Sequence, residues 1–482
     1  MPVISSSLAE AQRLLRGDQM EAALEILARE TASAAAVGPE HALQLQILLA
    51  RGERGEAEIA FDRAARLPAR SADAVDALAY YARELGRHEL SNMLYRRAVE
   101  LAPDDAQLVY NLATSERSLG HSVEALNACE RALELDPDSH PTLLLRSEIG
   151  RATREQEHVD ELRARLVADP SDSSRIFIGY ALGKELHDLG RYDEAFDAFA
   201  MAASTRRRLL SYDVADDERK LRRIQEAYPT RIADPEASPS DRHIFIIGLP
   251  RSGTTLIERI LGALPGVRSN GETNNLSTAL MSCAPATGVD VFDRCARAAP
   301  SALARAYEAL AARDVDEPKI IEKLPLNYLY VGAILGAFPR AKIVWVRRDP
   351  VDSCFAMFRT LFGNGYPFSY SFDDLARYYA AYDGLMRHWD EIFSQRLIQL
   401  RYEDLVKDPA VVGSDIARAC GLSWSEHALD LTRNRSASLT ASASQVRGAI
   451  YPSSAGLWKN YGPHLRPLIA KLDELMPANR PS

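Results

Sequence analysis

The sequence lacks the features that mark secreted, membrane-spanning or metal-dependent proteins. Only five cysteines occur among 482 residues, and none of them forms a C-x-x-C pair or a Cys/His metal-ligand spacing. Their scatter and odd number favour free thiols in a reducing compartment. No run approaches the roughly 20 apolar residues that cross a membrane, and the first residues lack the basic and apolar segments of a signal peptide. We therefore expect a cytoplasmic protein without a membrane span or a metal.

An excess of positive charge is also missing. Lysine and arginine number 58 against 67 acidic residues, which gives a net charge of −9. A general nucleic-acid binder normally carries a basic surplus, so that class is disfavoured, while a local basic pocket stays possible. The hydrophobic content of 46% and the charged content of 26% are those of a globular protein. The length allows about two to four domains.

A repeated pattern runs through the first half of the chain. A Leu-Gly dipeptide followed by a basic residue recurs at one and then two steps of 34 to 35 residues. It stands at residues 85–87, 119–121 and 189–191. Small residues on both sides of each glycine let two helices approach, and the glycine turns the chain between them. The pattern resembles the tetratricopeptide repeat, with five or six units over residues 8–206, although a generic helical bundle is the alternative.

The function of such an array is left open by the sequence. Stacked repeats form a superhelix whose concave face often binds an extended peptide. They also serve to form a homodimer or to brace a neighbouring domain. After the repeats, the charged stretch 213–223 is typical of a solvated helix face, and residues 233–240 are rich in proline and serine. We therefore predict a linker at 207–240 and a second domain at 241–482.

The second domain opens with a strand, a tight loop and a helix start. Residues 244–247 are a continuous apolar run, which predicts a strand buried on both faces. Gly248 and Gly253 then bracket a loop that leads into a helix at Thr254. A glycine loop at a helix start directs several N–H groups and the positive end of the helix dipole at one spot. This arrangement suits a phosphate or a sulfate, and a plain surface turn is the alternative.

The loop departs from the nucleotide-binding P-loop at one position. The P-loop pattern places lysine directly after its second glycine, and here Thr254 stands in that place. Arg251 is the only cationic residue inside the loop. An ordinary ATP or GTP site, and with it a nucleotide kinase, is therefore disfavoured.

Later polar residues stand where further strands are expected to end. Lys323 ends one strand, Arg348 follows another, and Tyr402 follows a third, while Glu272 lies in a polar loop just after Gly271. Ligands of open α/β sheets gather at the carboxyl ends of the strands. Lys323 could therefore face a ligand, although it also fits a surface lysine, and Glu272 also fits a solvated glutamate. Arg347 and Arg348 make a plausible second anion site, and the alternative for them is an ion-pair cluster with Asp349 and Asp352.

Five motifs in fixed order resemble the sulfotransferase superfamily, in the branch that holds the tyrosylprotein sulfotransferases and the bacterial tetratricopeptide-repeat sulfotransferases. The motifs are LPRSGTTL at 249–256, KLP at 323–325, RDP at 348–350, RYED at 401–404 and S-x-x-QVR at 442–447. The likeness covers about residues 241–475. It implies an all-α repeat superhelix followed by an α/β, P-loop-like sulfotransferase domain with a central parallel sheet.

The resemblance also implies a donor and roles for individual residues. The donor would be 3′-phosphoadenosine-5′-phosphosulfate, used without a metal. The donor-binding residues would be Arg251, Ser252, Gly253, Thr254, Thr255, Arg348, Ser353, Arg359, Tyr402, Gln445, Val446 and Arg447. Among these, the loop would hold the 5′-phosphosulfate and Arg348 the 3′-phosphate. Lys323 and Ser442 would support the transferring group, and Glu272 would be the general base.

Two departures from the family pattern support a rival hypothesis. Ala356 stands where the family usually has a serine, and Leu457 stands where the tyrosylprotein branch has a lysine. The first hypothesis is a sulfotransferase that acts on a hydroxyl or phenol, with a peptide tyrosine as one acceptor that the repeats could present. The second is a non-catalytic scaffold that binds a partner and keeps a vestigial nucleotide site.

Overall fold

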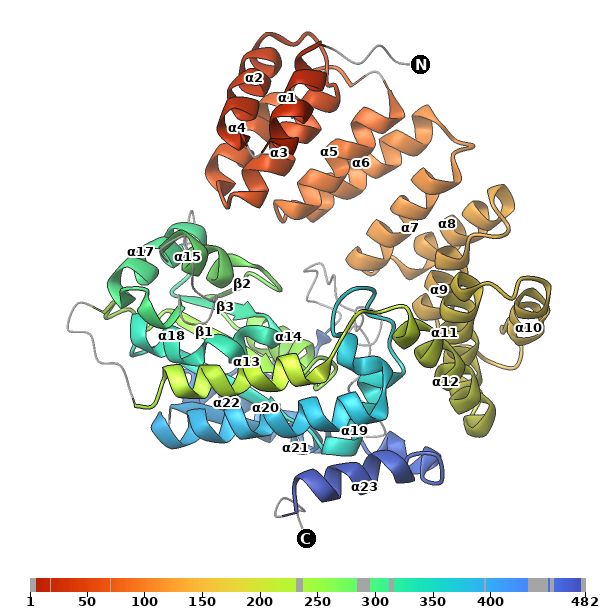
Figure 1. Ribbon diagram of the computed structural model, residues 1–482, viewed down its shortest axis with the longest axis vertical. Coiled ribbons are helices and arrows are strands. Elements are labelled where there is room, and N and C mark those ends of the chain that lie inside the picture. Colours follow the sequence, from red (N-terminus) through yellow and green to blue (C-terminus); the bar gives the residue numbers. More distant parts are fainter. Residues whose placement is uncertain are drawn as a thin grey trace. The chain divides into compact units, whose positions relative to one another are not determined.

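The computed structural model describes most of the chain in two compact units. The described residues are 6–17, 19–69, 71–230, 237–283, 295–311, 316–393, 396–431, 450 and 455–477. The units are Met1–Ile149 and Gly150–Ser482 (Figure 1). In these described ranges, no helix has the length and apolar character needed to cross a membrane.

The first unit is built from helices that pair with their neighbours in the chain. Its helices are α1 Ser6–Arg16, α2 Met20–Ser33, α3 Pro39–Ala50, α4 Arg54–Ala65, α5 Ala72–Glu84, α6 His88–Leu101, α7 Ala106–Leu119, α8 Ser122–Leu135 and α9 His140–Ile149. Fully buried alanines such as Ala79 and Ala98 let paired helices approach closely. Gly86 and Gly120 have φ of 77° and 83°, the left-handed conformation that ends a helix and turns the chain. The predicted helical hairpins are therefore confirmed.

The second unit begins with four more helices. They are α10 Val159–Ala168, α11 Asp172–Asp188, α12 Tyr192–Arg208 and α13 Val214–Ala227. In the α11–α12 hairpin, a Cβ atom on Gly183 would lie only 2.6 Å from the ring of Phe199, so the two helices need a glycine there. These helices cluster with the sheet that follows them, and α13 falls inside the segment 207–240. The domain boundaries at 206 and 240 stay predictions.

A parallel sheet organises the rest of the second unit. Its strands are β1 His243–Gly248, β2 Val267–Ser269, β3 Lys319–Lys323, β4 Lys342–Arg347 and β5 Leu397–Arg401. Their order in space is β2-β3-β1-β4-β5, and each pairing is parallel. All six residues of the central strand β1 are buried, as its apolar sequence predicts. Because every strand runs the same way, all the carboxyl ends lie on one edge of the sheet.

Helices cover both faces of this sheet. On one face, Ile244 and Ile246 share a core with apolar residues of α14 and α22. On the other face, the ring of Phe245 lies 5.5 Å from that of Tyr307 in α17, and the Trp345 indole donates to the Tyr382 hydroxyl in α20 over 2.8 Å. The predicted α/β domain with a central parallel sheet is therefore confirmed.

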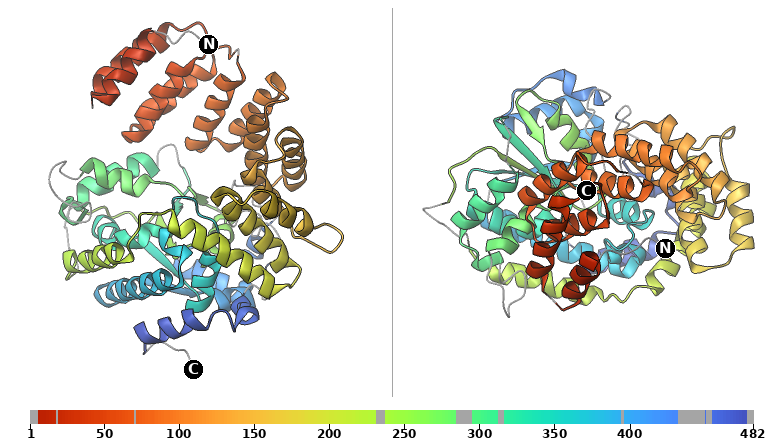
Figure 2. Two further views of the ribbon diagram at one scale, coloured as in Figure 1. Left: turned by 45° about the vertical axis from the view of Figure 1, so that its right-hand side comes forward. Right: turned by 90° about the horizontal axis from the view of Figure 1, so that it is seen from above.

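The elements around the sheet have the following bounds. The helices are α14 Thr254–Gly262, α15 Asn275–Cys283, α17 Pro300–Ala311, α18 Val331–Ala337, α19 Pro350–Phe358, α20 Phe372–Ile392, α21 Tyr402–Lys407, α22 Pro409–Ala419 and α23 Arg466–Leu475. The short 3-10 turns are η1 Pro325–Tyr330, η2 Pro367–Tyr370, η3 Glu426–Leu429 and η6 Leu457–Tyr461. The long helix α20 runs side by side with α13 (Figures 1 and 2).

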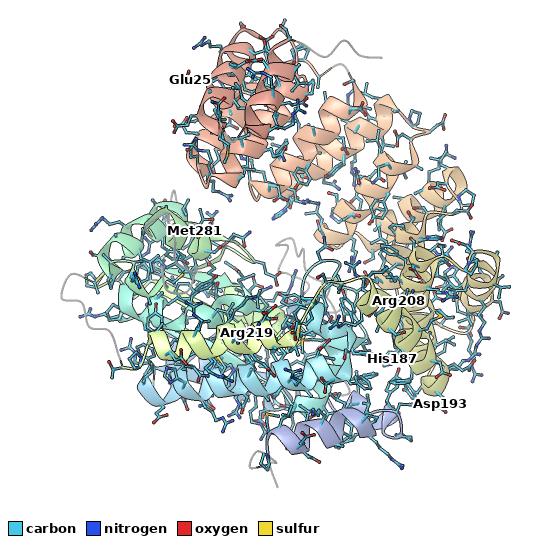
Figure 3. The ribbon with its side chains drawn as sticks, in the orientation of Figure 1. Glu25, His187, Asp193, Arg208, Arg219 and Met281 are labelled. Atoms are coloured by element: carbon cyan, nitrogen blue, oxygen red, sulfur yellow. The ribbon has the colours of Figure 1, made fainter. Side chains whose placement is uncertain are left out.

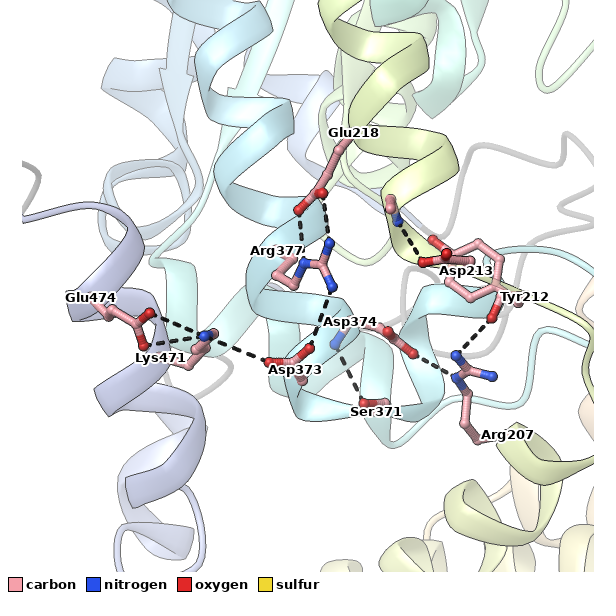
Figure 4. A network of polar contacts seen from close by, with 11 residues as sticks. Arg207, Tyr212, Asp213, Glu218, Ser371, Asp373, Asp374, Arg377, Lys471 and Glu474 are labelled. Carbon is pink, nitrogen blue, oxygen red and sulfur yellow. Dashed lines mark hydrogen bonds and ion pairs between the residues drawn. The ribbon is translucent and has the colours of Figure 1, made fainter.

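Ion pairs join α20 to the helices around it (Figure 4). Arg377 donates to both carboxylate oxygens of Glu218 on α13, over 2.8 and 2.7 Å. Asp374 accepts from Arg207 at the end of α12 over 2.6 Å. The Asp374 side chain is only 9% exposed, so this pair is screened less than an ordinary surface pair. The helical hairpin and the sheet domain are thus held together by charge as well as by apolar contact.

Candidate active site

The carboxyl edge of the sheet gathers the polar residues that the sequence singles out. The loop at 249–253 follows β1, and Lys323 ends β3. Arg348 comes directly after β4, and Tyr402 directly after β5. The register of the parallel pairs sets these ends at similar heights, since Ile246 pairs with Lys323 and Gly248 with Val346. One edge therefore receives side chains from four neighbouring strands.

The loop after β1 has a constrained backbone. Gly253 has φ of 103°, and a Cβ atom there would lie 2.3 Å from the Tyr402 ring. A Cβ atom on Gly248 would lie 2.7 Å from the carbonyl oxygen of Val346. Arg251 has φ of 66°, which is rare for a residue with a side chain and is typical of functional sites. The two glycines are therefore required where the loop meets β4 and Tyr402.

Three hydroxyl side chains lie at the start of α14. Ser252, Thr254 and Thr255 are 1%, 4% and 6% exposed. Within the described part of the chain, the buried hydroxyl oxygen of Ser252 has no hydrogen-bond partner. Backbone N–H groups at a helix start have no partner within their own helix and favour an anion. A buried hydroxyl beside them adds a further donor, so this loop can hold a phosphate or a sulfate.

Arg348 brings a guanidinium group to the same loop. Its side chain is 7% exposed, and its Nη1 donates to the backbone carbonyl of Arg251 over 2.9 Å. The guanidinium carbon also lies 4.7 Å from the centre of the Tyr402 ring, within cation–π range. The glycine loop and the RDP motif, which are separate in the sequence, therefore form one cationic cluster.

Asp352 makes an ion pair with the arginine of this cluster. Its carboxylate lies 3.6 Å from the Arg348 guanidinium and is 2% exposed. The two oxygens also accept from the backbone N–H of Gly456 over 2.5 Å and of Trp458 over 3.3 Å. Asp352 thus ties the segment that contains Leu457 to the arginine. The sequence suggested this aspartate only as an ion-pair partner.

Other residues of α19 do not all join the cluster. The hydroxyl of Ser353 lies 3.5 Å from the carbonyl oxygen of Arg348, at the limit of a hydrogen bond. Ala356 is buried. The Arg359 guanidinium points to α11, where its Nη1 lies 3.0 Å from Nε2 of His187. The structure therefore brings Ser353 near Arg348 and places Arg359 in a contact with the helical hairpin.

The contact around His187 explains why Arg359 is held there. His187, which Figure 3 labels, places Nδ1 2.7 Å from the hydroxyl of Tyr461. Burial and the nearby Arg359 charge lower the pKa of His187 to about 3. The ring is therefore neutral, so its Nε2 accepts from Arg359 and its Nδ1 donates to Tyr461. A guanidinium that is used in this way helps to fix the hairpin against α19 and η6.

Lys323 and Glu272 form a second charged group at the same edge. The Lys323 side chain is 1% exposed and makes an ion pair with Glu272, whose side chain is 30% exposed. The Lys323 amide also donates to the carbonyl of Gly271 over 3.0 Å. The structure thus brings these two predicted residues into direct contact.

A third charge, which sequence reasoning missed, completes this group. The carboxylate of Glu258 on α14 lies 3.4 Å from the Lys323 ammonium. Glu258 stands four residues after Thr254, so it lies on the same face of α14, one turn further on. This spacing could have drawn attention to it. Without the position of β3, however, nothing in the sequence distinguishes it from a solvated glutamate.

Glu322 lies on the opposite face of β3 and is buried. It accepts from the Tyr307 hydroxyl over 2.9 Å and from the Asn327 amide over 3.2 Å. Burial raises the pKa of Glu322 to about 7, although the hydrogen bonds oppose that rise. This carboxylate directly precedes Lys323 in β3 and joins the strand to α17 and η1.

Part of the predicted site lies outside the described residues. These predicted residues are Ser442, Gln445, Val446 and Arg447. A small hollow beside the loop is lined by Ser252, Arg348 and Ser353 together with Tyr379 and Tyr382 of α20. Over the residues that the structure does describe, no group of three or more His, Cys, Asp or Glu side chains could hold a metal ion.

Comparison with known proteins finds a family match in each unit of the chain. Residues 243–426 match the model of the sulfotransferase family. Residues 72–105 and 106–139 each match the tetratricopeptide repeat. The second unit therefore contains a region that matches the sulfotransferase family, and the helices α5–α8 of the first unit match two tetratricopeptide repeats.

Several individual proteins are similar to this chain. An uncharacterized protein of Aquifex aeolicus is 30% identical over 342 residues, which is 67% of this chain and 44% of that protein. Protein-tyrosine sulfotransferase 2 of Gallus gallus is 26% identical over 265 residues, or 50% of this chain and 71% of that protein. The sulfotransferase domain of the Synechococcus PCC 7002 olefin synthase is 20% identical with a TM-score of 0.39, covering 52% of this chain and 100% of that chain. The chain thus spans less than half the length of the Aquifex relative.

Proposed function

We propose that this protein transfers a sulfuryl group from 3′-phosphoadenosine-5′-phosphosulfate to a hydroxyl or phenol acceptor. One observation carries the proposal. At one edge of the sheet, an anion-binding loop in contact with Arg348 and a buried lysine paired with a carboxylate come from neighbouring strands. The match to the sulfotransferase family supports the same reaction type.

The cationic cluster supports the binding of a donor that carries two anionic groups. Residues 251–255 offer backbone N–H groups, hydroxyls and Arg251 for the 5′-phosphosulfate. Arg348, stacked on Tyr402, would take the 3′-phosphate, and Ser353 lies beside it. A guanidinium suits phosphate because it offers several N–H donors in one plane. In this proposal Gln445, Val446 and Arg447 line the rest of the nucleotide site.

The lysine and the carboxylate supply the chemistry of transfer. The acceptor oxygen attacks sulfur in line, the bond from sulfur to the bridging phosphate oxygen breaks, and the phosphate leaves as an anion. The charge spread over the sulfuryl oxygens is neutralised by Lys323 and by the loop N–H groups, with Ser442 as a further donor. Glu272 takes the proton that the acceptor hydroxyl loses. Holding both reactants in place accounts for much of the acceleration.

The acceptor is proposed from the nature of the relatives and the repeats. A protein-tyrosine sulfotransferase is among the relatives, and tetratricopeptide repeats commonly bind an extended peptide. A peptide tyrosine is therefore the acceptor to test first, followed by other phenols. The repeats would then present the peptide or bind a partner, and dimer formation through them is a further proposal.

Calorimetry of ligand binding tests the proposal against a scaffold and a kinase. The reaction product 3′,5′-adenosine bisphosphate should bind with one site per chain. AMP should bind at least 10-fold more weakly, because it lacks the phosphate assigned to Arg348. ATP with magnesium should not compete. Absence of bisphosphate binding at millimolar concentration would favour the non-catalytic scaffold, to which Ala356 and Leu457 point, and preferential ATP binding would favour a kinase.

A further inference from the structure

We propose that Glu258 is a positioning residue for the transfer reaction, holding Lys323 in place while Glu272 serves as the base. The inference rests on the proposed function and concerns the same site. It addresses a difficulty in the geometry, because the Glu272 carboxylate is occupied by the ion pair with Lys323 and must leave that pair before it can reach the acceptor hydroxyl. A second carboxylate on the same lysine resolves that difficulty.

The two carboxylates that hold the lysine differ in exposure. The Glu272 side chain is 30% exposed, whereas the Glu258 side chain is 12% exposed and therefore more deeply buried. Glu258 comes from the helix that follows the anion loop, and Glu272 comes from the loop after β2. Lys323 therefore has one partner that solvent reaches and one that is largely buried.

Glu258 is itself fixed by a hydrogen bond. Its Oε1 accepts from the hydroxyl of Ser269 over 2.7 Å, and its Oε2 lies 3.4 Å from the Lys323 ammonium. The oxygen of Ser269 in turn accepts from the backbone N–H of Gly271 over 3.1 Å. One carboxylate thus connects α14, the end of β2 and the end of β3. The contact also fixes the backbone of Gly271, which directly precedes Glu272.

The two ion pairs of Lys323 allow Glu272 to be released when the donor binds. The Lys323 side chain is 1% exposed, and a buried charge without a partner is costly, so its ammonium needs a counter-charge. When the donor is bound, its sulfuryl oxygens become a new partner for the ammonium at the mouth of the site. Glu258 still compensates the lysine from behind, so Glu272 can leave the ion pair and accept the proton of the acceptor hydroxyl.

Glu258 is assigned to positioning rather than to proton transfer because of its surroundings. One oxygen is occupied by the Ser269 hydroxyl and the other faces the lysine, and the side chain lies deeper than Glu272. An acceptor hydroxyl at the mouth of the site would meet Glu272 first. The alternative, in which Glu258 is the base, is one outcome of the test.

The test compares Glu258→Gln, Ser269→Ala and Glu272→Gln by steady-state sulfate transfer against pH, using the full chain and a tyrosine-containing peptide or a simple phenol. Glu258→Gln should lower kcat by about 10- to 100-fold through misplacement of Lys323. The rate of the Glu258→Gln variant should still increase with pH as in the wild type, and its Kd for 3′,5′-adenosine bisphosphate should change by less than about 3-fold.

Ser269→Ala, which leaves all three charges in place, should lower kcat by about 3- to 10-fold. Glu272→Gln should lose roughly 10²- to 10⁴-fold together with the rise of rate with pH.

Each result decides the assignment. Wild-type kcat in both Glu258→Gln and Ser269→Ala would overturn it. Loss of the pH-dependent rise in Glu258→Gln, with its retention in Glu272→Gln, would make Glu258 the base and also overturn it. If the Glu258→Gln variant fails to bind the bisphosphate, the Ser269→Ala variant alone decides the role of Glu258. A loss of kcat of about 3- to 10-fold would then support the positioning role, and a wild-type kcat would overturn it. Absence of transfer by the wild-type chain would instead contradict the proposed function itself.

Discussion

Arg348 donates a hydrogen bond to the backbone carbonyl of Arg251 over 2.9 Å, which joins two motifs that stand 97 residues apart in the chain. The bond holds a loop residue whose φ of 66° would otherwise be unfavourable. The same guanidinium lies over the Tyr402 ring. The loop, the arginine and the tyrosine therefore act as one unit, and we expect a substitution in any of them to lower the affinity for the donor.

Replacement of Arg348 should weaken donor binding much more than replacement of its neighbour. Arg348→Ala removes a charged hydrogen-bond donor, worth about 1.5 to 3 kcal/mol, so the Kd of 3′,5′-adenosine bisphosphate should rise by roughly 10- to 100-fold. Arg347→Ala is the matched control, because Arg347 points to Trp345 and Gln399. Its Kd should change by less than about 3-fold. Calorimetry measures both, and similar losses in the two variants would contradict the assignment.

The loop should not tolerate a side chain at Gly253. In Gly253→Ala, the new Cβ atom would lie 2.3 Å from the Tyr402 ring at a φ of 103°, so the ring or the loop must move. Bisphosphate binding should fall by more than about 10-fold, and the melting temperature should drop. Gly421→Ala is the control, because Gly421 has φ of 75° and no atom within 4 Å of the added Cβ. It should lose only about 1 kcal/mol of stability and keep binding. Equal binding by the two variants would show that the Tyr402 contact is unimportant.

His187 should make the second unit sensitive to acid. Its pKa is about 3 in the folded protein, because burial and Arg359 disfavour the charged ring, against an ordinary value of 6.5. A base whose pKa falls on folding contributes stability above pH 6.5 and loses it as the pH drops toward 3. His187→Gln cannot titrate, but its amide can accept from Arg359 and donate to Tyr461. When the pH is lowered from 7 to 5, the wild type should lose about 2 kcal/mol of unfolding free energy that the His187→Gln variant does not lose. Denaturant unfolding at both values tests this, and an unchanged difference would contradict it.

Glu322 should have the opposite pH dependence. Burial raises its pKa to about 7 from 4.5, so the folded protein prefers the protonated carboxyl. Stability is therefore lost as the pH rises from 4.5 to 7 and stays lost above that. Glu322→Gln stays neutral, and its amide can donate to the buried Asn327 oxygen, which has no hydrogen-bond partner among the described residues. From pH 5 to pH 8, the variant should gain up to about 3 kcal/mol relative to wild type. A constant difference would show that Glu322 does not titrate in this range.

The sequence predicted the fold well where local pattern decides it. The recurring glycines predicted the helical hairpins, and the apolar run at 244–247 predicted the central strand. The predicted end of the strand at Lys323 indicated the edge of the sheet at which ligands gather, whereas the ion pair of Lys323 with Glu272 was not predicted. These features depend on periodicity and on strand direction, both of which can be read along a single chain.

Other features depend on distances between distant segments and could not be read in this way. Glu258 gains its role from a strand that is far away in the sequence, and Arg359 points to His187 because α11 packs against the end of α19. Asp352 holds both Arg348 and the segment near Trp458. In each case the residue type is unremarkable, and only the tertiary packing shows which partner it meets.

Sulfuryl transfer by this protein should depend on Lys323 and Glu272. The most direct measurement incubates the purified full chain with sulfur-labelled 3′-phosphoadenosine-5′-phosphosulfate and a tyrosine-containing peptide or a phenol, and identifies the labelled product by mass. The wild-type chain should form a sulfate ester, and Glu272→Ala should form it roughly 10²- to 10⁴-fold more slowly while still binding 3′,5′-adenosine bisphosphate. Transfer at the wild-type rate by Glu272→Ala would contradict the assigned base. Bisphosphate binding without transfer to a hydroxyl or phenol acceptor, including those in lysate from the source organism, would contradict the proposed reaction.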